Sequence, residues 1–134
     1  MTKNIFLLTL TLLLSCQIFA QKSNNENSEF YINVFINSSK EVFVESQKTN
    51  FSEVEKGIKK IINAHPFKLD EKIIYRIFAD ENLKLGYIID VNQQMNKAFD
   101  ENIKTQRFLL NTVELNIDGK NWFESKKIKE LKGN

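Results

Sequence analysis

Short apolar segments with alternating positions recur along the chain and predict strands. Glu29–Ile36 (EFYINVFI) is rich in β-branched and aromatic residues, a composition typical of strands. Residues 37–40 (NSSK) are turn-forming, and residues 41–47 predict a second strand, so we expect a hairpin. Residues 72–79 (KIIYRIFA) are apolar enough for a central strand, and residues 107–116 predict a fourth.

Apolar positions spaced three and four residues apart predict two helices. The first follows Asn50, with Glu53 at the spacing of a capping box, and it ends where His65 precedes Pro66. Its apolar face consists of Phe51, Val54, Ile58, Ile61 and Ile62. The second helix spans about residues 85–99, and a short amphipathic helix is predicted after residue 120.

The predicted order is therefore strand, strand, helix, strand, helix, strand and a C-terminal tail. Each helix carries one apolar stripe and has only the sheet to bury it against. We expect a two-layer α+β domain over residues 29–116, with four or more strands and both helices on one face. A flexible polar tether, residues 21–28, precedes the domain, and a basic amphipathic tail, residues 117–134, follows it.

The first twenty residues have the pattern of a secretory signal. Lys3 precedes an apolar run over residues 5–20, and the polar chain begins after Ala20. Three outcomes stay open: cleavage after Ala20, lipidation of Cys16 in the lipobox-like sequence Leu-Leu-Ser-Cys, or retention as a short membrane anchor. All three place the domain outside the cytoplasm, and membrane contact is expected only through this segment.

Composition narrows the function classes. The chain of 134 residues has 19 basic and 17 acidic side chains, and this near balance argues against binding to nucleic acid. Cys16 is the only cysteine, so a processed chain has no disulfide, which suits a bacterial envelope protein better than a small eukaryotic secreted domain.

Candidate catalytic residues are few, and we predict a protein that is not an enzyme. His65 is the only histidine, and its place at a helix end favours a structural role. One histidine cannot assemble a zinc site, and the scattered glycines form no phosphate loop, so no metal or cofactor is expected. Asp80 and Glu81 end a central strand, where a hydrolase would place acids, but we favour Asp80 as a corner residue that binds nearby backbone amides.

One stretch of the sequence resembles a known family. Residues 73–99 (IIYRIFADENLKLGYIIDVNQQMNKAF) are similar to the periplasmic domain of the ExbD/TolR biopolymer-transport family, where a strand ends in Ala-Asp before a loop with Gly and a helix. Ala79 with Asp80, Gly86 and residues 88–91 fit that pattern. The upstream hairpin, residues 31–46, and the helix TNFSEVEKGI match in position, so the resemblance covers about residues 29–115.

The resemblance implies a homodimeric domain in a proton-driven envelope complex that binds partner proteins or peptidoglycan. Family members carry an acidic residue in a transmembrane helix, whereas residues 5–20 have none. We therefore expect a binding component that does not relay protons itself, with self-pairing through residues 107–116 or the first hairpin. The candidate binding residues are Asp80, Gly86, Trp122 and Phe123.

A second interpretation from a different class stays open. The chain would then be a small secreted α+β binding or inhibitor protein unrelated to transport, and it would be a monomer in solution.

Overall fold

The computed structural model describes residues 28–99 and 103–132. The predictions for the signal segment, the tether through residue 27 and lipidation at Cys16 fall outside these residues. The elements are β1 (Glu29–Ile36), β2 (Val42–Val44), β3 (Gln47–Thr49), η1 (Phe51–Glu53), α2 (Val54–Ala64), β4 (Lys72–Asp80), α3 (Leu85–Asn96), β5 (Lys104–Leu110) and α4 (Lys126–Lys132).

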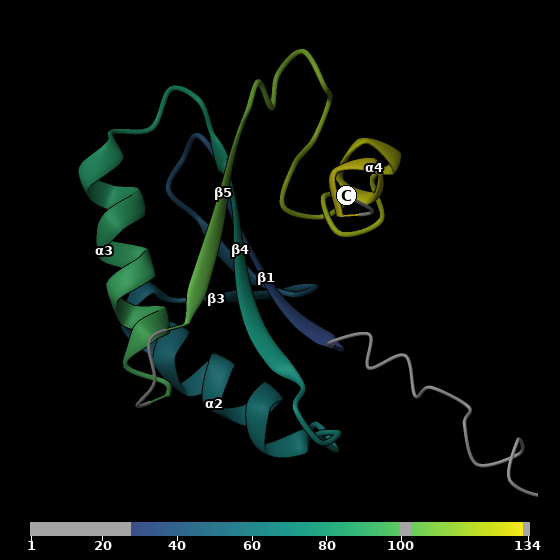
Figure 1. Ribbon diagram of the computed structural model, residues 1–134. Coiled ribbons are helices and arrows are strands. Elements are labelled where there is room, and N and C mark those ends of the chain that lie inside the picture. Colours follow the sequence, from purple (N-terminus) through teal and green to yellow (C-terminus); the bar gives the residue numbers. More distant parts are fainter. Residues whose placement is uncertain (1–27, 100–102, 133–134) are drawn as a thin grey trace, which may run out of the picture.

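The predicted α+β class is confirmed by a five-stranded sheet in the order β3-β2-β1-β4-β5. The long strands β1, β4 and β5 are parallel neighbours, because α2 and α3 each return the chain to the same end of the sheet (Figure 1). The short strand β2 pairs antiparallel with β1, and β3 pairs antiparallel with β2.

Both long helices cover one face of the sheet, as expected (Figure 1). In α2, Val54, Ile58 and Ile62 are buried, and in α3 the stripe includes Ile88 and Val91. These helical side chains pack on mostly aliphatic residues of β1, β2 and β4. The sheet side of this cluster consists of Ile32, Val34, Ile36, Val42, Val44, Tyr75, Ile77 and Ala79.

The predicted strand at residues 41–47 divides in two. Glu45 has a φ of 50°, and a two-residue turn at Glu45 and Ser46 reverses the chain so that Val44 pairs with Gln47. This left-handed conformation is uncommon for a residue with a Cβ. The amide of Glu45 donates to the carbonyl of Asn33 at 2.8 Å, and its carboxylate accepts from the Asn33 amide at 2.7 Å, which holds the turn against β1.

The fourth predicted strand, residues 107–116, is placed too late. The strand observed is β5, which begins at Lys104 and pairs with residues 74–80 of β4. It ends at Leu110 because β4 offers no partner further on and Asn111 starts a turn, its side-chain oxygen accepting from the Glu114 amide at 3.0 Å.

The capping box at Asn50 is also wrong in detail. The Asn50 side chain makes no capping hydrogen bond to a backbone amide, and a 3-10 turn at η1 leads into α2 instead. The Asn50 carbonyl accepts from the Glu53 amide at 2.9 Å. The predicted helix end is confirmed, since His65 before Pro66 adopts extended backbone angles.

Candidate functional site

Asp80 lies at the carboxyl end of β4 with no exposed surface. Its Oδ1 accepts from the Asn82 amide at 2.9 Å, and its Oδ2 accepts from the Thr112 hydroxyl. Burial alone would raise the pKa of Asp80, but these hydrogen bonds outweigh it and hold the pKa below its usual value. The predicted corner role is confirmed.

The same geometry argues against Asp80 as a hydrolytic acid. A general acid at neutral pH needs a raised pKa and access to substrate, whereas Asp80 has a lowered pKa and a buried side chain. The neighbouring Glu81 is exposed, and its amide donates to the Leu110 carbonyl at 2.9 Å, which ties β4 to the end of β5.

Gly86 sits in the first turn of α3 and is exposed. A Cβ at this position would meet no atom within 4 Å, so no close contact requires glycine.

The structure corrects the prediction of Trp122 as a residue that binds a partner. Its side chain is fully buried on the face of the sheet opposite α2 and α3, which we call the second face. There it stacks on Phe35, with ring centroids 5.3 Å apart. Phe123 is half-buried and meets Trp122 edge to face at 5.3 Å. Trp122 therefore belongs to the domain's own core, and Phe123 packs against it with part of its side chain exposed.

His65 has the structural role predicted for it, through contacts that the sequence did not specify. Its ring stacks on Phe30 at 3.6 Å, and its Nε2 lies 2.9 Å from Oε2 of Glu71. Hydrogen bonds from the Lys68 amide and from His65 lower the pKa of Glu71. The cluster joins the loop after α2 to the start of β1.

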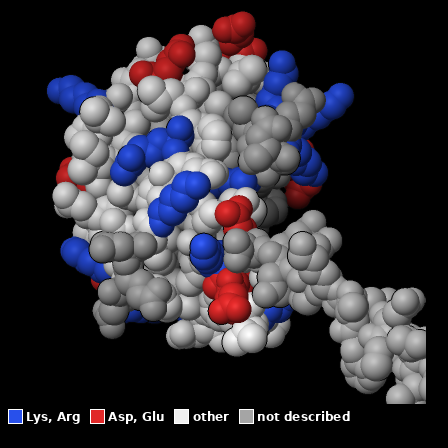
Figure 2. Space-filling view, in the orientation of Figure 1, with Lys and Arg blue, Asp and Glu red and all other residues white. Residues whose placement is uncertain are grey.

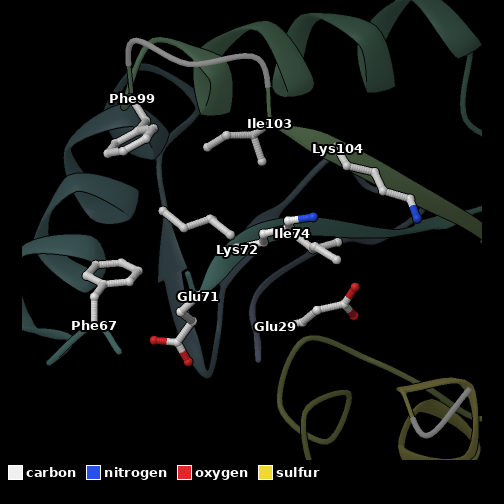
Figure 3. A pocket seen from close by; sticks show the side chains of 9 residues that line it. Glu29, Phe67, Glu71, Lys72, Ile74, Phe99, Ile103 and Lys104 are labelled. Atoms are coloured by element: carbon white, nitrogen blue, oxygen red, sulfur yellow. The ribbon is translucent and has the colours of Figure 1, made fainter. Parts of the chain in front are cut away.

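The four predicted binding residues do not form one site. Asp80 ends β4 and Gly86 lies in the first turn of α3, while Trp122 and Phe123 lie on the second face. The larger of the two cavities described here is lined by none of them. It has a volume of about 650 Å³ and lies where β1, β4 and β5 begin (Figure 3). Its lining consists of Glu29, Phe67, Glu71, Lys72, Ile73, Ile74, Phe99, Ile103 and Lys104.

A second feature missed from the sequence is an exposed apolar surface near the carboxyl end of β5. Leu109 is 61% exposed and pairs with Ala79, so it points to the same side of the sheet as α3. Leu85 and Ile89, one turn apart on α3, are also exposed. We call the open edge of β5, together with its exposed Leu109, the β5-edge surface. The period-2 pattern of β5 would have revealed Leu109 had the strand been placed correctly.

On the face in Figure 2, Lys and Arg side chains are interspersed with Asp and Glu side chains and uncharged atoms. Within the described residues, no group of His, Cys, Asp and Glu is arranged to hold a metal ion. No helix in this part of the chain is long and apolar enough to cross a membrane. Comparison with models of protein families and with curated proteins finds no match.

Proposed function

We propose that this chain is a non-catalytic binding protein of the bacterial cell envelope that works as a homodimer. Its domain would act as the periplasmic domain of an ExbD/TolR-type biopolymer-transport component, binding partner proteins or the cell wall. A sheet with two helices on one face is the fold that this resemblance implies, and the α+β fold supports it.

The observation that carries the proposal is the β5-edge surface. Strand β5 pairs only with β4 in the part of the chain described, so the backbone groups on its other side face outward. An open strand edge that carries an exposed leucine favours pairing with another strand. A second copy of β5, antiparallel to the first, would satisfy the edge and bury Leu109 of both copies about a two-fold axis.

The opposite edge is a weaker candidate for self-pairing. Strand β3 has only three residues, and Lys48 at its centre forms an ion pair with Glu41 across the hairpin. Short strands and lysines are the usual protection against edge-to-edge association.

The oligomeric state tests the proposal. For the protein recovered after export, light scattering with size-exclusion chromatography is expected to give a dimer. Leu109→Lys should convert it to a monomer, because a charged side chain would then replace the apolar one that the dimer buries beside the paired edge. Leu69→Lys is the matched control: Leu69 is 92% exposed in the loop before β4, at the other end of the sheet, and its variant should stay dimeric.

Cell fractionation tests the location. The chain should appear in the periplasm or the envelope membranes of a bacterium that expresses it, and its intact mass should show cleavage, lipidation or retention of the first twenty residues. A monomeric wild-type protein, or a chain confined to the cytoplasm, contradicts the proposal.

A further inference from the structure

The cavity where β1, β4 and β5 begin has apolar walls. Phe67 comes from the loop before β4, Phe99 from the turn after α3, and Ile103 from the residue before β5 (Figure 3). Ile73 and Ile74 of β4 supply the rest of the apolar lining. A volume of about 650 Å³ lies in the range of small-molecule sites in proteins.

The two carboxylates at the cavity, Glu29 and Glu71, already accept hydrogen bonds from other groups of the protein. Glu71 accepts from the Lys68 amide at 3.1 Å and contacts His65, while Glu29 accepts from the Tyr31 hydroxyl. The carboxylates are thus directed at donors of the chain itself.

The two lysines have no such partner. Neither Lys72 nor Lys104 forms an ion pair within residues 28–99 and 103–132. Figure 3 places Lys72 in the middle of the lining residues, with Phe67 and Phe99 on one side and Lys104 on the other. The cavity therefore offers two ammonium donors beside apolar walls.

We propose that this cavity binds an amphipathic carboxylate, a single molecule whose apolar chain lies against Phe67, Phe99 and Ile103 and whose carboxylate meets Lys72 and Lys104. An ammonium–carboxylate contact is a charge-assisted hydrogen bond, the stronger kind, and it fixes the orientation of the ligand. A small hydrophilic anion would leave the apolar walls in water, and an uncharged apolar molecule would leave both lysines unused.

Calorimetric titration with laurate, below its micelle concentration, tests the site on the full processed chain. We expect saturable binding of one laurate per chain. The double variant Lys72→Gln/Lys104→Gln should weaken binding by about tenfold or more, since both charge-assisted hydrogen bonds to the carboxylate are lost. The control Lys56→Gln/Lys84→Gln removes two exposed lysines from α2 and from the residue before α3, changes the net charge equally, and should bind as wild type.

Three results would overturn the proposal: no binding of laurate by the wild type, equal weakening in both double variants, or dodecanol binding as tightly as laurate. Binding only to vesicles that contain anionic lipid, and not to free laurate, would assign the lysines to a membrane surface instead. The outcome is independent of the proposed dimer, because Lys104 begins β5 and Leu109 lies near its other end.

Discussion

The face of the sheet under α2 and α3 is packed with aliphatic side chains, whereas the face under the C-terminal segment is packed with aromatic rings. On the helix side, isoleucines and valines of β1 and β4 meet the stripes of two helices. On the other side, Phe35 and Phe78 of the sheet meet Trp122 and Ile128 of the segment after β5, and α4 lies over this side in Figure 1. The first face is covered by regular helices, and the second mainly by a loop.

The loop is held in shape by a short polar network. Asp118 Oδ1 accepts from the amides of Lys120 and Asn121 at 2.8 and 2.9 Å, and the Asn121 side chain accepts from the Asp118 amide. The Trp122 amide donates to the Asp118 carbonyl at 3.0 Å. These local hydrogen bonds hold the loop so that the Trp122 indole packs on the sheet. The comparison teaches that a loop can cover a sheet face with one large side chain, whereas a helix covers it with a row of apolar side chains.

The side chains on the second face change from aromatic to polar along the strands. Beyond the aromatic cluster, Arg76 of β4 lies over the ring of Tyr31 at 3.5 Å and donates from Nε to the Gln106 side chain at 2.9 Å. The tail therefore covers the aromatic end of the face, and paired polar side chains continue the surface toward the start of the strands.

Removing the indole of Trp122 should have the largest effect if the second face is true core. We expect Trp122→Ala to lower the free energy of unfolding by about 3–5 kcal/mol, as much as a buried helix-face truncation such as Ile58→Ala at about 2–5 kcal/mol. Urea unfolding followed by far-UV circular dichroism measures both losses.

A matched surface variant calibrates that comparison. Leu69→Ala, at an exposed loop position, should change stability by no more than about 0.5 kcal/mol. Trp122 is also the only tryptophan, so its fluorescence reports on the tail in the wild type. A small loss in Trp122→Ala, or a fluorescence transition at lower urea than the dichroism transition, would make the tail a separate unit.

The close approach of Gly119 to Phe43 gives a second, smaller test of the aromatic face. A Cβ on Gly119 would lie 1.9 Å from the Cζ atom of the Phe43 ring, so Gly119→Ala should destabilise by about 1–3 kcal/mol through overpacking. Gly86→Ala is the matched control, since its Cβ meets only open space and a helical alanine should cost nothing.

Replacing the Phe43 ring with a smaller side chain tests whether overpacking causes the loss of stability in Gly119→Ala. In the double variant Phe43→Leu/Gly119→Ala, the cost should be less than the sum of the two single variants, because the smaller side chain leaves room for the new methyl group. Additive losses in urea unfolding would place the strain elsewhere.

The helix face could be predicted from the sequence because periodicity reports on it directly. The stripe of α2 and the apolar run of β4 each follow one regular spacing, which predicts β4 and the end of α2 to within one residue. The start of α2 is less well predicted, because a 3-10 turn occupies Phe51–Glu53. The bounds of β5 could not be predicted in this way, because apolar residues recur past Leu110 at Val113 and Leu115. The end of β4 together with the turn at Asn111 decides where pairing stops.

The aromatic face and the cavity lie beyond what a pattern can reveal. Ile117, Trp122 and Ile128 follow no helical or strand period, so burial of the tail depends on tertiary contacts that leave no local signal. The cavity residues come from separate segments, and Lys72 and Lys104 line the same cavity only because two parallel strands start at the same end. Asp80 was the exception, since a strand end followed by Asn82 predicted its corner role.

The smallest effect on stability that we predict concerns Asp80, which binds the chain segment between β5 and the C-terminal tail. Thr112 lies between β5 and the tail, and its hydroxyl donates to Asp80. Asp80→Asn keeps a similar shape but loses the charge, so at neutral pH we expect a loss on the order of 1 kcal/mol in the free energy of unfolding.

The pH dependence of that loss identifies its origin. Because the pKa of folded Asp80 lies below the ordinary value of about 3.9, its stabilisation is complete above that value and disappears as pH falls through the lowered pKa. The stability curves of wild type and Asp80→Asn, measured by urea unfolding from neutral to strongly acidic pH, should therefore converge at the acidic end. The exposed neighbour Glu81→Gln should track the wild type throughout. A constant gap between wild type and Asp80→Asn at every pH would attribute the loss to packing, and the charge of Asp80 would then have no part in holding the tail segment to β4.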